Sequence, residues 1–342
     1  MFRRRPRPRE LEMRMTPTQR RPGAHAIYPL RPDYVGLARF LAEPREDVLG
    51  AVVFGRAPEA PGLVAVPLAP AQGMDLVECW RGRSPVQRGT QDDISYAHDG
   101  VVLFASLMND GMPGIERAAE DAYHRLLTLT ERLGYPHVLR AWNHFSDIHG
   151  DENGLDRYRR FNIGRHRALA SRLRAGWVRP AASVIGMRIP GLRVYLLASV
   201  VPGQAIDNPR QIRPCRYPPQ YGPRPPDFSR AIKADLAGRQ CVFVSGTAAI
   251  QGHASQSRED PMGQLDETLR NLDAVLRAAG VLDVAPITAL KIYTSAAAPP
   301  RLAERIAAWL PHGASAVYLI GDICRAELTV EIEAFVSPGD NI

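Results

Sequence analysis

The chain contains 342 residues, of which 45% are apolar and 23% are charged, and its formal net charge is +7. These values are typical of a globular protein of about two domains. No run of 18 apolar residues is present and no apolar stretch follows the basic N-terminus, so we expect neither a membrane span nor a secretory signal.

The positive charge is concentrated at the start of the chain. Residues 1–22 contain eight Arg and two Glu, a balance of +6, which leaves about +1 for the other 320 residues. This Pro- and Arg-rich composition predicts a disordered basic leader over residues 1–22. Basic segments also occur in RNA-binding proteins, but a charge confined to the leader favours no nucleic-acid partner.

Residues 23–95 follow with little periodicity. Short strands are predicted at 51–54 and 63–67, and we expect this region to precede or extend a first sheet. An internal repeat comes next. Its first copy predicts a strand within 99–110, a helix within 114–136, a strand within 137–148, a helix over 155–173, and strands over 181–189 and 192–201.

The second copy of the repeat has the same order of elements. Leu265, Leu269, Leu272 and Leu276 recur at intervals of three and four, which predicts one apolar helix face, and Gly280 stands where a helix stop is expected. The predicted elements are a strand within 238–250, a helix within 261–283, a strand within 286–296, a helix over 300–310, and strands over 314–322 and 327–335.

The repeat predicts an α/β (α+β) protein of two units, each a mixed sheet with two helices on one face. We place the units at residues 23–201 and 230–342. The segment between them, 202–229, is rich in Pro and Arg, with eight prolines in 202–226. Such a segment is either a stiff linker or a rigid platform whose Arg and Tyr side chains bind a carboxylate.

The last predicted strand carries an acidic face. Because side chains alternate along a strand, Glu327, Glu331 and Glu333 are expected on one face, opposite the apolar residues between them. The matching strand of the first copy carries no acid. The face is either solvated or partly buried, and in the second case a glutamate of raised pKa could act as a general acid.

No cofactor site is evident in the sequence. The cysteines (Cys79, Cys215, Cys241 and Cys324) form no CxxC pair, which argues against a zinc ribbon or a disulfide scaffold and fits a cytoplasmic location. There is no P-loop, dinucleotide fingerprint or GxSxG. The polar loop at 147–152 lacks the spacing of a calcium site, so we expect no metal and no other cofactor.

The segment 238–336 resembles the RidA (YjgF) superfamily through VFVSGTAAI, QLDETLRNLDAVLRAAG, ITALKIYTS and TVEIEAF. In that superfamily the first glutamate of the final E-I-E is an active-site acid, which is Glu331 here. Imine deaminases of the superfamily carry an arginine fifteen residues earlier that binds the substrate carboxylate. This chain has Ala316 at that position, so the resemblance argues against simple imine hydrolysis.

Over about residues 100–336 the chain resembles a longer branch, the chorismatases, which contain two RidA-like units. The matching segments are AWNHFSDIHGDENGLDRYRRFNIGR, NPRQIRPCRYPPQYGPRPPDFSRA, SGTAAIQGHAS and GDICRAELTVEIE. Chorismatases release pyruvate from chorismate and form a dihydroxycyclohexadiene carboxylate, 3-hydroxybenzoate, or both 3- and 4-hydroxybenzoate.

The resemblance implies that Glu331 protonates the enolpyruvyl ether and that no cofactor is needed. Cys324, seven residues earlier, is cysteine in the hydroxybenzoate-forming type and alanine in the hydrolytic type, which implies 3-hydroxybenzoate as product. Ala248 departs from the glycine associated with that product. A hydrolytic chorismatase, and a RidA-like protein that binds small acids without turnover, are the alternatives.

Chorismate carries two carboxylates, so two cationic groups are expected to bind it. The sequence favours Arg216 beside Tyr217, and Arg165 after Tyr158. The remaining predicted substrate contacts are Tyr221, Gly246, Thr247 and Ala248. Since RidA proteins are trimers with sites between subunits, a monomer and a trimer-like assembly both remain open for a chain of two units.

Overall fold

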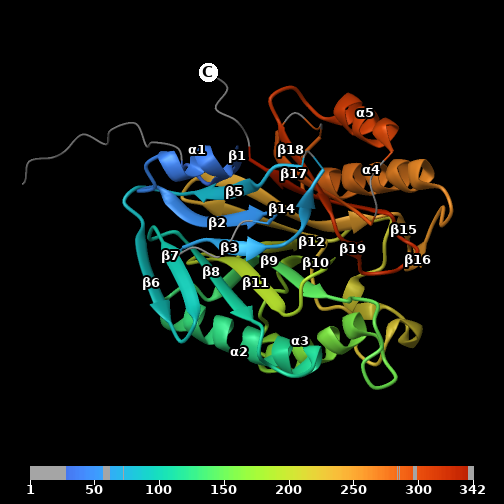
Figure 1. Cartoon of the computed structure of the whole chain (residues 1–342), viewed down its shortest axis with the longest axis horizontal. Coiled ribbons are helices and arrows are strands. Elements are labelled where there is room, and N and C mark those ends of the chain that lie inside the picture. Colours follow the sequence, from blue (N-terminus) through green and yellow to red (C-terminus); the bar gives the residue numbers. More distant parts are fainter. Residues whose placement is uncertain are drawn as a thin grey trace, which may run out of the picture.

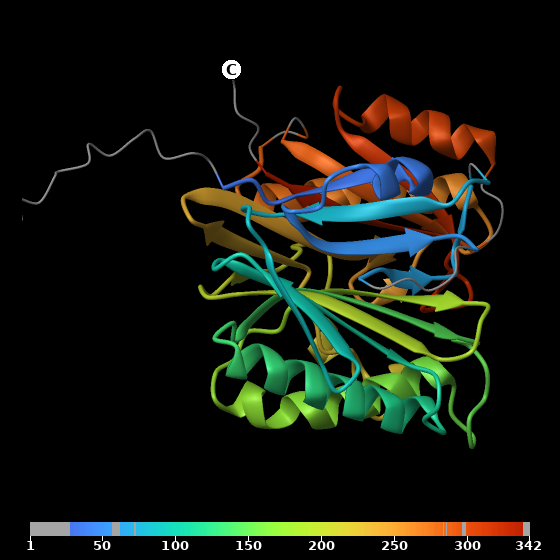
Figure 2. The same ribbon diagram turned by 60° about the vertical axis from the view of Figure 1, so that its left-hand side comes forward.

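The computed structural model describes residues 28–56, 62–71, 73–282, 284, 286–295 and 299–337, and the predicted basic leader lies outside these ranges. Two seven-stranded sheets and one four-stranded sheet make up most of the described chain. Figures 1 and 2 show the sheets facing one another, with helices on the outside. The predicted mixed α+β architecture is confirmed.

The N-terminal unit is a sheet of order β19-β10-β9-β11-β8-β7-β6, with α2 and α3 packed on its outer face. Ala119, Ala122 and Leu126 give α2 the apolar stripe that packs on the sheet. The elements of this unit are β6 (Gln87–Gln91), β7 (Ile94–His98), β8 (Val102–Asn109), α2 (Ile115–Arg132), β9 (His137–Ser146), α3 (Arg157–Arg174), β10 (Ala181–Met187) and β11 (Leu192–Ser199).

The C-terminal unit repeats this connectivity in a sheet of order β12-β13-β14-β20-β17-β18-β4, covered by α4 and α5. β14 and β20 correspond to β8 and β11, and β17 and β18 correspond to β9 and β10. The elements are β12 (Gln204–Ile206), β13 (Ala231–Leu236), β14 (Arg239–Ala248), β15 (Ile250–Gln251), β16 (Ala254–Ser255), α4 (Pro261–Ala278), β17 (Ile287–Thr294), α5 (Pro300–Trp309), β18 (Ser315–Ile320) and β20 (Val330–Val336).

The third sheet is a departure from the sequence-based expectation. Within residues 23–95, β6 and the start of β7 extend the first sheet as expected, but the residues before β6 do not. They form a separate four-stranded sheet of order β1-β5-β2-β3, while β4 joins the C-terminal sheet. The separate sheet was not expected, because short buried strands show no alternation that would assign them to a sheet. The elements are β1 (Arg31–Gly36), α1 (Leu37–Ala42), β2 (Val48–Phe54), β3 (Val64–Val66), β4 (Ala69–Pro70) and β5 (Leu76–Arg81).

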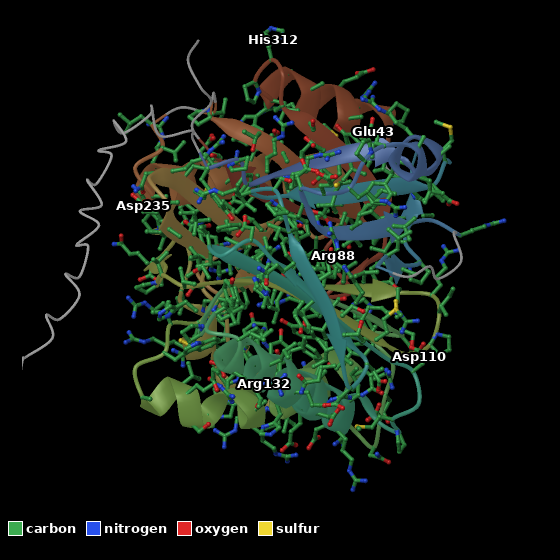
Figure 3. All side chains as sticks on the ribbon, turned by 90° about the vertical axis from the view of Figure 1, so that its left-hand side faces the viewer. Glu43, Arg88, Asp110, Arg132, Asp235 and His312 are labelled. Atoms are coloured by element: carbon green, nitrogen blue, oxygen red, sulfur yellow. The ribbon has the colours of Figure 1, made fainter. Side chains whose placement is uncertain are left out.

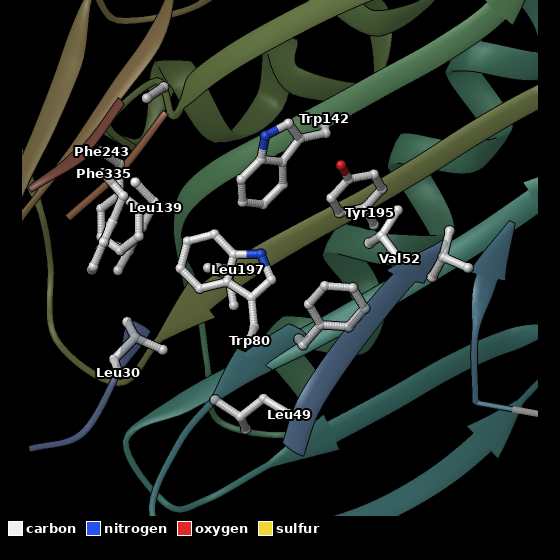
Figure 4. Close-up of a cluster of buried hydrophobic side chains, with 14 of the residues drawn as sticks. Leu30, Leu49, Val52, Trp80, Leu139, Trp142, Tyr195, Leu197, Phe243 and Phe335 are labelled. Carbon is white, nitrogen blue, oxygen red and sulfur yellow. The ribbon is translucent and has the colours of Figure 1, made fainter. Parts of the chain in front are cut away.

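One core joins the three sheets. Trp80 of the third sheet packs against Trp142 of β9 at a ring-centroid distance of 5.5 Å and against Phe335 of β20 at 5.4 Å. Figure 4 shows these rings together with Tyr195 and Phe243 in the central cluster. In contrast, Asp110, Arg132, Asp235 and His312 are exposed at the periphery of Figure 3. Charged side chains buried between the sheets are therefore exceptions to this distribution, and a structural or functional reason is expected for them.

Two predicted strands end differently in the structure. The strand expected over 314–322 stops at Ile320, and a separate strand, β19 (Asp322–Ile323), pairs with β10 of the N-terminal unit. The last strand begins at Val330 rather than at Glu327, which lies in the preceding turn and accepts a hydrogen bond from Ser255. Glu327 is therefore not part of an acidic strand face.

The segment between the units has more structure than a linker. Its β12 pairs with β13, and two short 3₁₀ turns, η1 (Pro214–Arg216) and η2 (Pro219–Tyr221), follow. Proline suits such turns because its φ angle is fixed, and it has no backbone N–H that would need a hydrogen-bond acceptor.

In the described part of the chain, no helix has the length and apolarity needed to cross a bilayer.

Candidate active site

A cavity of about 350 Å³ lies where the two units and the segment between them meet. A volume of this size suits a small organic ligand. From the N-terminal unit come residues of β10 and of the loop and helix around Tyr158, and from the C-terminal unit come the end of β14, the segment after β19, and β20. Its lining comprises His149, Asp156, Tyr158, Arg159, Ala182, Ser183, Val184, Tyr217, Tyr221, Pro226, Phe228, Arg230, Gly246, Ala248, Ile250, Cys324, Arg325, Ala326, Glu327 and Glu331.

Glu331 reaches this cavity from the inner face of β20 and is only 5% exposed. Burial, and then the negative charge of Glu333, raise the pKa of its carboxyl to about 8, against the lowering effect of Arg140 and Arg230. The group is therefore protonated at neutral pH. A buried, protonated carboxyl beside a cavity can donate a proton to a bound ligand.

A β-bulge in β14 makes room for this carboxyl. The register of β14 against β20 shifts between Val244 and Thr247, which places Gly246 beside Glu331. A Cβ atom on Gly246 would lie 1.8 Å from Oε1 of Glu331. Glycine is therefore required here by close approach, and bulges next to active sites commonly redirect side chains in this way.

Glu333, on the same face of β20, is held in an ion-pair cluster. Lys291 lies 2.9 Å from one carboxylate oxygen, Trp142 Nε1 donates to the same oxygen at 2.7 Å, and Arg140 and Ser183 donate to the other. Burial alone would raise the pKa of Glu333, but Lys291, Arg140 and Ser183 outweigh it and lower the pKa to about 2. Glu333 is therefore an anion.

Cys324 directly follows β19 and lines the cavity. Burial, and then the charge of Glu331, raise the pKa of its thiol to about 12, so the thiol stays neutral. The Tyr158 hydroxyl is next to it, and burial raises the pKa of that hydroxyl well above its usual value. These groups form a neutral wall rather than a nucleophilic pair.

Three arginines line the cavity. Arg325 stacks on Tyr221 at 4.1 Å from the ring centroid and donates to the carbonyl of His253. Arg230 donates to the Tyr217 hydroxyl at 2.7 Å and lies over Phe228. Arg159, the third, has a half-exposed side chain. The guanidinium of Arg230 keeps a buried Nε without a hydrogen-bond partner among the described residues, so it can still bind an anion.

The structure brings seven of the ten predicted site residues to the cavity: Glu331, Cys324, Tyr158, Tyr217, Tyr221, Gly246 and Ala248. Thr247 is buried next to them and donates to the Ser245 carbonyl. Arg216 is exposed, and Arg165 lies buried over the Tyr123 ring rather than in the lining. Ala316 packs on the helix side of its sheet.

The cationic groups that line the cavity were missed from the sequence. Arg230 and Arg325 both stand inside segments that carry the chorismatase resemblance. Arg230 directly precedes β13, and Arg325 lies two residues after the end of β19. Their proximity to Tyr217 and Cys324 in the folded chain was not deducible from spacing. Arg216 and Arg165 had equally good spacing, so the sequence alone could not separate the two pairs.

Fold and cavity together define a class: a protein of two units with the same order of strands and helices, with a cavity lined by a protonated carboxyl and several guanidinium groups. Comparison with known proteins narrows this class. A family model described as Chorismatase FkbO/Hyg5-like, N-terminal, matches residues 78–198. A 3-hydroxybenzoate synthase of Streptomyces hygroscopicus is 34% identical over 324 residues, which cover 88% of this chain and 95% of that protein.

Two further relatives agree. A chorismatase of Streptomyces rapamycinicus is 32% identical over 77% of this chain and 82% of its own length. A crystal structure of a chorismatase superimposes with a TM-score of 0.82 and 29% identity, covering 92% of this chain and 100% of that chain. The chain belongs to the chorismatase family.

Proposed function

We propose that the protein cleaves chorismate to pyruvate and 3-hydroxybenzoate, with Glu331 as the proton donor. The observation that carries this proposal is the protonated Glu331 carboxyl beside a cavity lined by guanidinium groups. The name of the 3-hydroxybenzoate synthase relative supports the product. Formation of 4-hydroxybenzoate as a second product is compatible with the same site.

The reaction balances without water or an oxidant. Glu331 gives its proton to the methylene carbon of the enolpyruvyl ether, which produces an oxocarbenium-like group. Attack by the neighbouring ring hydroxyl breaks the ring carbon–oxygen bond and releases pyruvate, while the Glu331 carboxylate accepts the hydroxyl proton. The resulting arene oxide opens to the aromatic product, so the acid is regenerated within one turnover.

Arg230 and Arg325 are the residues we propose to bind the two substrate carboxylates. Arg230 stands on the Glu331 side of the cavity, where its charge acts on that carboxyl. Arg325 is held by Tyr221 stacking and by the His253 carbonyl, which leaves the other edge of its guanidinium for the ligand. A planar fork of donors suits a carboxylate.

We propose that Cys324 and Ala248 decide which nucleophile attacks. Both side chains line the cavity near Glu331, and neither offers a charge that would hold a water molecule. A neutral wall favours the ring's own hydroxyl over solvent. A larger or more polar space here is expected to give the dihydroxycyclohexadiene carboxylate of a hydrolytic chorismatase instead.

The test is incubation of the purified protein with chorismate, with pyruvate measured enzymatically and the aromatic products separated by chromatography. Glu331→Gln keeps the shape of the side chain and is expected to lower kcat by about a thousandfold. Glu304→Gln, at an exposed position of α5, is the matched control and should keep the full rate. Binding of chorismate without pyruvate release would favour the small-acid binding alternative.

We also propose that the protein acts in the cytoplasm without a nucleic-acid partner. All four cysteines are free thiols, as a reducing compartment would keep them. A monomer and a trimer-like assembly are both compatible with a chain of two units, and sedimentation analysis separates them, since a monomer has a mass near 37.7 kDa. Deletion of residues 1–22 should leave chorismate turnover unchanged.

A further inference from the structure

We propose that Glu333 is a positioning residue for Glu331: its locked negative charge, two residues away on the same face of β20, keeps the proton donor in its acid form. This inference rests on the proposed function, in which Glu331 must be protonated. Glu333 itself does not line the cavity and has no route to the substrate. It acts only through its neighbour.

The geometry holds Glu333 in place from both units. Its donors are Arg140 and Trp142 of β9, Ser183 of β10, and Lys291 of β17, and both carboxylate oxygens are engaged. Lys291 in turn lies 2.8 Å from Glu78 of the third sheet. The Glu333 side chain is only 4% exposed. Because four side chains donate to it, its negative charge and its rotamer are both fixed.

Few other charges face this pair of glutamates. His144 is fully buried, and burial together with Lys291 lowers its pKa to about 3, so it is neutral. Burial raises the pKa of each facing tyrosine, which keeps those hydroxyls neutral as well. The groups that face Glu331 and Glu333 are Tyr34 (β1), Glu78 (β5), Arg140 and His144 (β9), Tyr195 (β11), Lys291 and Tyr293 (β17), Arg230, Tyr158 and Cys324.

Two sets of groups act on the pKa of Glu331 in opposite directions. Arg140 and Arg230 favour the carboxylate form of Glu331, whereas burial and Glu333 favour the acid form. Arg140 is shared, because it also donates to Glu333. If Glu333 lost its charge, only burial would oppose Arg140 and Arg230, and Glu331 would ionise at a lower pH.

Three variants separate charge from shape. Glu333→Gln keeps the shape and removes the charge, and it should move the basic limb of the kcat/KM profile at least one pH unit lower, which means a loss of rate of about fivefold at pH 8 and about tenfold at higher pH. Glu333→Asp keeps the charge and shortens the side chain, so its basic limb should stay at the wild-type pH whatever its plateau rate. Arg140→Met should move the limb to higher pH.

A purely structural role predicts something else. All three variants would then lower the rate equally at every pH and leave the limb in place, which would overturn the proposal. If Glu333→Gln fails to fold, the opposite shift expected for Arg140→Met still decides, because an unmoved limb in that variant contradicts control by charge.

A direct titration keeps this inference separate from the proposed function. Infrared difference spectra of the ligand-free protein report the protonated carboxyl band that disappears in Glu331→Gln. That band should titrate near pH 8 in the wild type and at lower pH in Glu333→Gln. If the wild type does not turn over chorismate, the proposed function fails while this titration still tests the pairing of the two glutamates.

Discussion

The two units of this protein share one topology and differ in one position that matters. β11 pairs with β9 in the N-terminal unit, and β20 pairs with β17 in the C-terminal unit. Each pairing contains a register shift, which lies after Leu197 in β11 and after Phe335 in β20. Counting four residues back from each shift gives Arg193 in the N-terminal unit and Glu331 in the C-terminal unit. The same frame therefore presents a cation in one copy and a proton donor in the other.

The surroundings of these two positions differ as well. Arg193 forms an ion pair with Asp110, so its charge is compensated within its own unit. Glu331 has no hydrogen-bond partner within the described ranges, and its carboxyl is left to a ligand. A buried acid of this kind lowers stability, which is a cost that functional sites commonly carry, and here only the C-terminal unit carries it at this position.

The largest expected effect is a change in stability when the buried Glu331 carboxyl is replaced. The folded-state pKa of Glu331 is raised to about 8, so its destabilising effect is absent below the unfolded value near 4.5 and grows until the folded pKa is passed. Glu331→Gln should therefore stabilise the protein at pH 7 by about 3 kcal/mol, and by almost nothing at pH 4. Arg193→Gln, at the matched position, should lower stability.

Thermal unfolding at both pH values measures this difference. Equal melting temperatures for Glu331→Gln and wild type at pH 7 would mean that the acid is not buried at a cost. Stabilisation by Arg193→Gln would mean that the two positions do not differ as described.

A second test concerns the bulge between β14 and β20, which has no counterpart between β8 and β11. β8 pairs with β11 without interruption, whereas β14 is shifted at Gly246. Gly246→Ala should displace the Glu331 carboxyl and lower kcat by about a hundredfold, because misplacing a reacting group by an ångström has effects of that order. Ser106→Ala, in the unbroken strand β8, should retain activity within about twofold. Steady-state kinetics on folded samples, checked by circular dichroism, decide the matter.

A third test asks which cations bind the substrate. Arg325→Gln should raise KM for chorismate by about thirtyfold, since a charge-assisted hydrogen bond is lost. Arg216→Gln is the control, because Arg216 is exposed although it stands in the same Arg-rich region that the sequence favoured. A larger KM change in Arg216→Gln than in Arg325→Gln would reverse the assignment.

The smallest expected effect concerns the product. Cys324→Ala removes one sulfur atom from the neutral wall and so enlarges the cavity. It should shift part of the product, by a few-fold change in ratio, toward the dihydroxycyclohexadiene carboxylate. Total pyruvate release should change little, because Cys324 is a neutral thiol that donates no proton to substrate. An unchanged product ratio would separate this residue from control of the nucleophile.

Much of the architecture was accessible from the sequence. Leucine spacing in α4 and the β-branched runs of the repeat predicted both units, since each element buries one face at a regular period. The third sheet was not predicted, because its short strands make sense only against the core of the other two. Likewise β19 could not be foreseen, since its pairing with β10 joins residues far apart in the chain.

The site was predicted in part for the same reason. Glu331 and Cys324 lie on segments with a recognisable pattern, and the structure places both at the cavity. Lys291 was not singled out, although it is one of only two lysines beside 41 arginines. Its role depends on a partner in the third sheet, Glu78, and no local pattern in the sequence indicates such a pairing.

The small strand β19 has a consequence for how such a duplicated protein can change over generations. It follows β18 of the C-terminal unit in the sequence but takes its hydrogen bonds from β10 of the other unit, and Cys324 and Arg325 come directly after it. In a chimera of halves from two different relatives, β10 and β19 would come from different parents, and their pairing lies beside the residues that face the ligand. We therefore expect a recombinant of two relatives to keep an intact cavity only when both halves come from the same parent.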